Sequence, residues 1–144
     1  MYWEENLETM NEGALKEMQL KLVNQTLVKA AEAPFYRNIS GKKLRTLEEI
    51  RELPFTRKQD LRDHFPYGFL RTDLSEAVRL HSSSGTTGNP TVVFHTRADI
   101  ENWTNQVARS MYMIGVRPGD VFQNTMGYGL FTGGLGFHYG AEKI

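Results

Sequence analysis

The chain has 144 residues, the size of one ordinary domain, and 40% of them are hydrophobic, which is enough for a core and argues against intrinsic disorder. Lysine plus arginine and aspartate plus glutamate number 17 each, so the formal net charge is zero and a generally basic nucleic-acid-binding protein is excluded. The absence of cysteine excludes a disulfide scaffold, a thiol nucleophile and zinc–thiolate or iron–sulfur sites.

The N-terminal half, residues 1–76, has the pattern of several short helices. Apolar residues recur at helical spacing between Leu7 and Leu27, and Pro34 closes that segment. Pairs with capping-box spacing predict three helix starts, at Thr9 with Glu12, Thr46 with Glu49 and Thr56 with Gln59. We therefore expect residues 1–76 to be a helical subdomain without chemistry of its own.

Residues 77–144 have the pattern of an α/β domain. Strands are predicted at Ala77–His81, Thr91–His95 and Val121–Met126. A strand, a helix and a strand in succession favour a mainly parallel sheet with a right-handed crossover. A parallel sheet of so few strands would leave an exposed edge, so we expect the N-terminal part of a larger α/β protein. An exposed edge can also pair with the edge of a second copy of the chain, so a homodimer remains an alternative.

A helix is predicted between the second and third of these strands. Thr96 can cap its start, with Asp99 in its first turn, and its apolar face runs from Ile100 to Ile114. Gly115 suits its C-terminal cap. The sequence Pro118-Gly119-Asp120 then predicts a turn before the third strand.

The glycine-rich segment near the C-terminus resembles a membrane span only by its lack of charge. Val121–Ala141 has 21 residues without Asp, Glu, Lys or Arg, but it contains six glycines and several polar residues. Continuous apolarity is what a spanning helix needs. The acidic N-terminus also lacks the apolar stretch of a secretory signal. We therefore expect a cytoplasmic protein that does not bind membranes.

The most informative segment is the run of Ser, Thr and Gly between the first two predicted strands, Ser82–Thr91. Its glycines allow backbone geometries in which successive N–H groups converge on an anion, and its hydroxyls supply further donors. A triphosphate is the ligand that fits so many donors best. The candidate nucleotide-binding residues are Ser83, Ser84, Gly85, Thr86, Thr87 and Gly88. On composition alone, a flexible linker remains the alternative.

Other chemical motifs fit less well. A Walker A loop needs a lysine after its last glycine, and here Gly88 is followed by Asn89 and Pro90. The four histidines are not spaced as zinc ligands, so no metal site is predicted, and a serine-hydrolase elbow is absent from the sequence. His81, directly before the loop, could sense phosphate charge, but we expect a strand-end histidine satisfied by the backbone.

Four blocks in order resemble the adenylate-forming (ANL) superfamily and, more narrowly, its phenylacetate–coenzyme A ligases. They are Pro54–Thr56 with Lys58–Arg62, Ser83–Gly88 with Pro90–Val93, Val107–Ser110 with Arg117–Asp120, and Gly127–Gly136 with His138–Glu142. The resemblance implies the acyl-CoA synthetase-like fold, present here only in its first part. One departure is Asn89, where this family often has lysine, so the loop brings no fixed cation of its own.

Enzymes of this family activate an arylacetic acid with MgATP to an acyl-adenylate, and coenzyme A then displaces AMP. The resemblance thus implies ATP, Mg²⁺ and coenzyme A as cosubstrates and assigns the β- and γ-phosphates to the loop. It also implies an acid pocket in the last block, with substrate-binding residues Tyr128, Phe131, Gly133 and Gly134. The alternative for the two aromatics is that they are ordinary core residues on a glycine-rich helix.

The resemblance places the catalytic lysine and the Mg²⁺-binding acidic residue beyond Ile144, so no catalytic residue is assigned and the chain alone is expected to be inactive. Two alternatives stay open. The acid could be of the indole-acetate or benzoate type. A non-catalytic interaction module is the interpretation from a different functional class.

Overall fold

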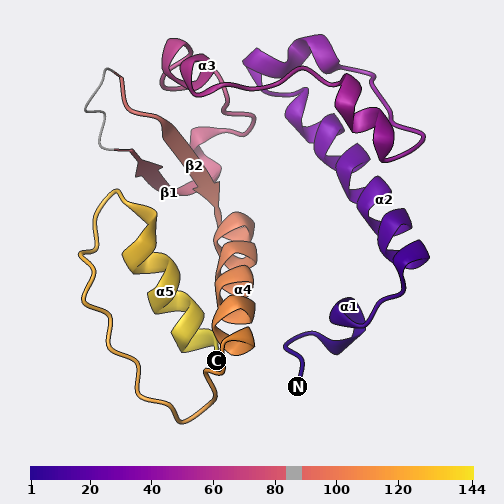
Figure 1. Ribbon diagram of the computed structural model, residues 1–144. Coiled ribbons are helices and arrows are strands. Elements are labelled where there is room, and N and C mark those ends of the chain that lie inside the picture. Colours follow the sequence, from indigo (N-terminus) through magenta and orange to yellow (C-terminus); the bar gives the residue numbers. More distant parts are fainter. Residues whose placement is uncertain (84–88) are drawn as a thin grey trace. The chain divides into compact units, whose positions relative to one another are not determined.

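The computed structural model describes residues 1–83 and 89–144, and the chain divides into two compact units. Unit 1 contains Met1–Thr9, residues 75–83 and Val93–Ile144, whereas unit 2 contains Met10–Leu74 and residues 89–92. The chain therefore begins in unit 1, passes through unit 2, returns to unit 1 at residue 75, contributes residues 89–92 to unit 2 and ends in unit 1. Figure 1 shows its course from the N-terminus to the C-terminus.

Helices dominate the described residues, and a two-stranded sheet accompanies them (Figure 1). The elements in chain order are α1 (Glu5–Glu8), α2 (Glu12–Ala30), the 3₁₀ helices η1 (Pro34–Ile39) and η2 (Glu48–Glu52), α3 (Lys58–Asp63), η3 (Leu74–Glu76), β1 (Ala77–Ser82), β2 (Val92–Thr96), α4 (Arg97–Met113) and α5 (Thr132–Lys143). The predicted helical character of the first half and two of the three predicted strands are thus confirmed. Within the described ranges, none of the helices has the length and apolarity needed to cross a membrane.

The start of α2 lies at a different cap from the predicted one. The side chain of Asn11 accepts the N–H of Ala14 at 2.9 Å and forms the N-cap. Thr9 instead ends α1, and its hydroxyl donates to the Glu5 carbonyl at 2.7 Å. The predicted box at Thr9 and Glu12 is therefore wrong, because Asn caps a helix as well as Thr does and Asn11 lies directly before the helix.

The other two predicted boxes are shifted as well. Before α3, the Asp60 carboxylate accepts the N–H of Arg57 at 2.6 Å, one residue later than the predicted pair of Thr56 and Gln59. Before η2, the Glu49 carboxylate accepts the N–H of Arg45 at 2.7 Å, one residue before the predicted Thr46. In both cases a charged carboxylate, which is a stronger acceptor than a neutral side chain, selects the amide that it bonds.

Helix α4 has the predicted caps at both ends. Thr96 Oγ1 accepts the N–H of Asp99 at 3.3 Å, and the Asp99 carboxylate accepts the N–H of Thr96 at 2.8 Å. After its last turn, Gly115 has a φ of 110°, and its N–H donates to the Tyr112 carbonyl at 3.1 Å. A side chain is disfavoured at this φ, which explains the glycine.

The predicted turn at Pro118-Gly119-Asp120 is formed, but the predicted strand after it is not. The N–H of Asp120 donates to the Arg117 carbonyl at 3.1 Å, and Gly119 has a φ of 94°. Residues 121–126 have no regular structure, and Val121 is 99% exposed. A strand needs a neighbour that pairs with its backbone, and the sheet of the described residues consists of β1 and β2. The predicted parallel crossover, from the strand at residues 91–95 to the one at residues 121–126, is therefore not formed in the described residues. The two strands that are present run in opposite directions (Figure 1).

The sheet has one polar and one apolar face. Arg79 and His81 of β1 lie on the side that contacts the rest of unit 1. Val78 and Leu80 alternate with them on the opposite side of the strand and are exposed. The outer face of the sheet is thus an exposed apolar surface.

The core of unit 2 forms where α2 meets η1 and the segment after it. Leu27, Ile39 and Leu44 are buried together. The amide of Asn24 fixes this segment, since it accepts the N–H of Leu44 at 2.8 Å and donates to the Leu44 carbonyl at 2.9 Å. A second cluster is aromatic, with Phe35 stacked on Phe69 at 4.4 Å between ring centres. Together these contacts account for the compactness of unit 2.

In unit 1, the N-terminal residues attach to α4. The Glu4 carboxylate accepts hydrogen bonds from the Arg109 guanidinium and from Asn105 Nδ2. The indole N–H of Trp3 donates to Asn105 Oδ1 at 2.9 Å. The hydrogen bond from Arg109 lowers the pKa of Glu4 below its ordinary value. The first nine residues are therefore held by a charged contact rather than by a large apolar one.

Helices α4 and α5 lie side by side because α5 has glycine at the positions of closest approach (Figure 1). A Cβ added at Gly136 would lie 2.7 Å from Trp103 Cζ2, and one at Gly140 would lie 2.6 Å from Val107 Cγ1. Both glycines are buried, and they are four residues apart on one face of the helix. The glycines thus set the distance between the two helices.

We expect Gly140→Ala to destabilise unit 1 by about 1–3 kcal/mol, because the added methyl group overlaps Val107 and the neighbouring α4 backbone. The matched control is Gly13→Ala in α2, where the added Cβ meets only Asn11 Oδ1 at an ordinary 3.4 Å. That control should gain up to about 1 kcal/mol of helix propensity. Urea unfolding followed by circular dichroism measures both, and equal effects of the two substitutions would contradict the packing argument.

Candidate functional site

The predicted phosphate loop begins directly after β1. Of its candidate residues, Ser83 is described, and its carbonyl accepts the hydroxyl of Ser82 at 2.9 Å. The other candidates lie outside the described residues: Ser84, Gly85, Thr86, Thr87 and Gly88. Their role in binding phosphate therefore stays a prediction.

The end of β1 is bonded to the predicted acid-binding block. The carbonyl of Leu130 accepts the backbone N–H of Ser82 at 2.9 Å, and it also lies 2.9 Å from Nδ1 of His81. Because a carbonyl can only accept, Nδ1 of His81 carries the proton of this second bond. The expectation that His81 is satisfied by the backbone is confirmed. The C-terminal end of β1, which leads into the Ser/Thr/Gly run, is thus bonded to Leu130, the residue directly before Phe131.

Three aromatic rings form a cluster behind this contact. His81 is only 2% exposed, and its ring is nearly perpendicular to those of His95 and Trp103, with centres 5.3 and 5.4 Å away. The ring of His95 stacks on Trp103 with 18° between the planes. Among the described residues, Nε2 of each histidine is buried without a hydrogen-bond partner. The cluster is therefore packed like a core but contains two uncompensated polar atoms.

Burial lowers the pKa of His95 below its ordinary value of 6.5, and the neighbouring His81 lowers it further when charged. Asp99 acts in the opposite direction, with a smaller effect than burial. The neutral imidazole is the form that this burial favours.

Tyr128 and Phe131 lie in the segment before α5 and are exposed by 56% and 70%, so neither is a core aromatic of the described chain. The hydroxyl of Tyr128 accepts a hydrogen bond from Asn124 Nδ2 at 3.2 Å and lies 3.0 Å from Nδ1 of His138. Nε2 of His138 faces the Glu142 carboxylate at 3.3 Å. This series of contacts orients the Tyr128 ring.

The two glycines predicted to line the pocket have different surroundings. Gly134 is buried, and an added Cβ would lie 2.7 Å from the Gly127 carbonyl oxygen. At Gly133, an added Cβ would meet the side chains of Met126 and Phe131 at 3.3 Å. Gly134 therefore permits the close approach of the Gly127 main chain, and the predicted contact of these glycines with an acid stays a prediction.

A small cavity of about 120 Å³ lies between α4 and the start of α5. Its lining combines residues of both helices: Trp103, Val107, Thr132, Gly133, Gly136 and Phe137. The cavity shares Gly133 with the predicted acid-binding residues. Sequence reasoning missed the contribution of Trp103, which carries no signal for a site because it belongs to the regular apolar face of its helix.

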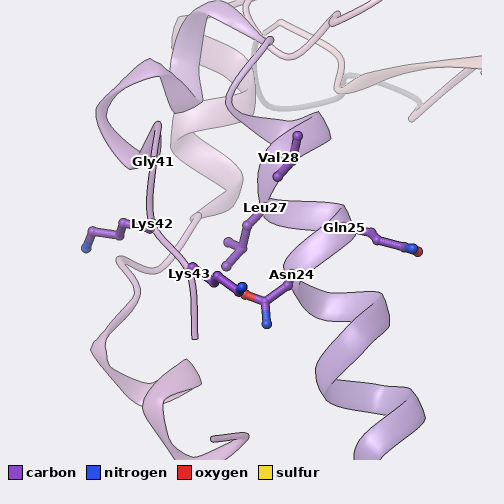
Figure 2. Close-up of a pocket in the computed structure, with 7 residues that line it drawn as sticks. All are labelled: Asn24, Gln25, Leu27, Val28, Gly41, Lys42 and Lys43. Atoms are coloured by element: carbon purple, nitrogen blue, oxygen red, sulfur yellow. The ribbon is translucent and has the colours of Figure 1, made fainter. Parts of the chain in front are cut away.

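A larger pocket of about 420 Å³ lies in unit 2 (Figure 2), lined by Asn24, Gln25, Leu27, Val28, Gly41, Lys42 and Lys43. Its polar groups do not converge on one point. The Asn24 amide is occupied by Leu44, and the side chains of Gln25 and Lys42 point away from each other (Figure 2). We assign this pocket to the packing of residues 41–44 on α2. In the part of the chain that is described, no group of three His, Cys, Asp or Glu side chains could hold a metal ion.

The buried state of His95 makes stability depend on pH. Its lowered pKa means that the unfolded chain binds more protons than the folded chain below pH 6.5, so stability is full above pH 6.5 and falls as the pH drops toward the lowered value. We expect His95→Phe, which keeps a stacking ring, to lose less stability between pH 7.5 and 5.5 in urea titrations. The matched control is His64→Phe, which removes an exposed imidazole of unit 2, and equal losses in both variants would contradict this assignment.

Comparison with curated proteins identifies one set of relatives. Phenylacetate–coenzyme A ligases are similar over nearly the whole chain, with 47% identity in the protein from Pseudomonas putida, 44% in that from Escherichia coli and 42% in that from Thermus thermophilus. The matches cover 96%, 96% and 100% of the chain but only 33%, 33% and 34% of these relatives. The chain therefore spans about a third of the length of the curated relatives. No protein-family model matches the chain.

Solved structures agree with the sequence relatives. A crystal structure of 2-hydroxyisobutyryl-CoA ligase in complex with 2-HIB-AMP superposes with a TM-score of 0.87 at 33% identity, covering 99% of the chain and 32% of the ligase. An open conformation of that ligase with 2-HIB-AMP and CoA gives the same TM-score and identity. Over nearly its whole length, the chain is thus similar in sequence to about a third of the phenylacetate–coenzyme A ligases, and it has the corresponding part of the adenylate-forming fold seen in 2-hydroxyisobutyryl-CoA ligase.

Proposed function

We propose that this chain carries the triphosphate-binding loop and part of the acid pocket of an ATP-dependent aryl-acid–coenzyme A ligase. The reaction converts phenylacetate, ATP and coenzyme A into phenylacetyl-CoA, AMP and diphosphate. The observation that carries the proposal is the 42–47% identity to phenylacetate–coenzyme A ligases along nearly the whole chain. We keep the division into a helical part, residues 1–76, and the first part of the α/β domain, residues 77–144, as part of this proposal.

The reaction has two steps, each of which breaks one bond. A carboxylate oxygen of the acid attacks the α-phosphorus of MgATP, and the bond to the β-phosphate oxygen breaks to release diphosphate. The thiol of coenzyme A, after losing its proton, then attacks the acyl carbon, and AMP leaves. The first step needs donors for the charge that develops on the leaving diphosphate. Ser83 and the loop residues Ser84–Gly88 supply hydroxyl and backbone donors for it.

The acid would lie against the block that begins at Tyr128. The exposed rings of Tyr128 and Phe131 offer flat apolar surfaces to an aryl group, and Gly133 and Gly134 let the main chain and these side chains pack closely beside it. The bonds from the end of β1 to Leu130 support this location, because they bring the acid-binding block next to the strand that enters the loop. Short distances between the two substrate sites are what an attack of carboxylate on phosphorus requires.

The acid itself has a second candidate class. The similarity to 2-hydroxyisobutyryl-CoA ligase, at 33% identity, supports a small hydroxy acid, whereas the exposed aromatic pair favours an aryl acid. Indole-acetate and benzoate-type acids belong to the same aryl class. We further propose a cytoplasmic location, where MgATP and coenzyme A are available, and a homodimer that light scattering would detect.

We expect the chain to bind MgATP and Ser83→Ala and Thr86→Ala each to weaken that binding about tenfold or more, since each removes a donor to a charged phosphate. Ser110→Ala is the matched control, because the Ser110 hydroxyl donates to a carbonyl within α4. Isothermal titration calorimetry measures the affinities. Wild-type affinity in both loop variants would remove the loop from the nucleotide site.

A coupled assay of AMP release with phenylacetate, indole-acetate, benzoate and 2-hydroxyisobutyrate tests the reaction class. We expect acid-dependent AMP formation from a protein that extends over the full length of the relatives, and none from the 144-residue chain alone. The described part of the acid pocket explains this, because Tyr128 and Phe131 are open to water, which an adenylate must be protected from. Rapid turnover by the chain alone would contradict the proposal that it supplies only a part of the active site. No turnover by either protein would favour the non-catalytic interaction module.

A further inference from the structure

The geometry points to His81 as a positioning residue for the acid-binding block, a role that deepens the proposed function and rests on it. The Nδ1–H of its ring holds the Leu130 carbonyl and thereby fixes Tyr128 and Phe131 relative to the strand end that leads into the serine run. The residue touches neither substrate in this role, and it acts through the main chain of its partner.

The held segment has few other attachments. Residues 121–131 form no helix or strand, so their position depends on individual hydrogen bonds. Two of these reach Leu130 from β1, one from the Ser82 amide and one from His81. At the other end of the segment, Asn124 Nδ2 donates to the Gly134 carbonyl at 2.7 Å. Leu130 directly precedes Phe131 and follows Tyr128 by two residues, so its carbonyl anchors the main chain that joins the two rings, while the Tyr128 hydroxyl has its own contact with His138.

The ring of His81 is held in one orientation. It packs edge-on against His95 and Trp103, which stack on each other, and it is almost completely buried. A ring confined in this way points its Nδ1 in a fixed direction, and the low polarity around it strengthens the bond to Leu130. This contact requires a proton on Nδ1.

Because Nε2 of His81 is buried, an apolar residue would pack at this position at a lower cost in free energy. This atom has no hydrogen-bond partner among the described residues, and burying an unpaired polar atom is unfavourable. A leucine would fill the same space without that cost. The donor at Nδ1 is what only a histidine, or an asparagine of similar reach, supplies here.

Arg79 provides a control that distinguishes the proposed role of His81 from a general attachment of β1 to α5. Arg79 lies two residues earlier on the same face of β1, and it donates to the Tyr139 hydroxyl at 3.0 Å. Tyr139 belongs to α5, beyond the acid-binding block. Loss of Arg79 should therefore loosen the sheet from the helix while leaving the bonds to Leu130 in place.

The test uses three substitutions of His81 that differ in where they offer a donor. His81→Asn places an amide near the position of Nδ1, His81→Gln places it near Nε2, and His81→Leu offers none. Hydrogen exchange of the Ser82 and Phe131 amides and the affinity for phenylacetate are measured in each, with Arg79→Leu as the control. In the wild type, nitrogen NMR of the ring reports the tautomer directly.

We expect the proton on Nδ1, near wild-type exchange and affinity in His81→Asn, and about tenfold weaker phenylacetate binding with faster exchange in His81→Leu and His81→Gln. Arg79→Leu should keep both readouts. A proton on Nε2, or rescue by glutamine as complete as by asparagine, overturns the inference. If the wild type binds no phenylacetate, the proposed function has failed, and the tautomer and the exchange rates still decide whether His81 holds the segment.

Discussion

The contact between Trp103 and Gly136 joins the elements on which the candidate site depends. One edge of the indole lies where a Cβ of residue 136 would be, which lets α5 approach α4. One face of the same ring stacks on His95 of β2, and its edge meets His81 of β1. A single side chain therefore connects two helices and two strands. A change of this ring would therefore disturb its contacts with both helices and both strands at once.

Local signals in the sequence were sufficient wherever the responsible atoms are close along the chain. The caps of α4 at Thr96, Asp99 and Gly115 were predicted correctly because each acts within a few residues of its partner. The shifted starts of α2 and α3 show the limit of such rules, since several adjacent residues can cap a helix. The strand predicted at residues 121–126 failed for another reason. A strand exists only with a pairing partner, and local sequence does not contain that partner.

The candidate site could be predicted only in part, for a related reason. The serine- and glycine-rich run was predicted because its residue types suit phosphate, and the Tyr128–Gly134 block was predicted from the family resemblance. The bond between His81 and Leu130 joins residues 49 positions apart, and its acceptor is a main-chain carbonyl. A carbonyl belongs to every residue, so no side-chain pattern could reveal it. The same holds for the role of Trp103, which the helical period of α4 explains fully by itself.

The exposed apolar face of the sheet has a practical consequence. Val78 and Leu80 face water, and such a surface lowers its free energy whenever another apolar surface covers it. Copies of the chain can do this for one another, to an extent that grows with protein concentration. Ligand affinities should therefore be measured at several protein concentrations. A charged residue introduced at Val78 would reduce self-association of the sample.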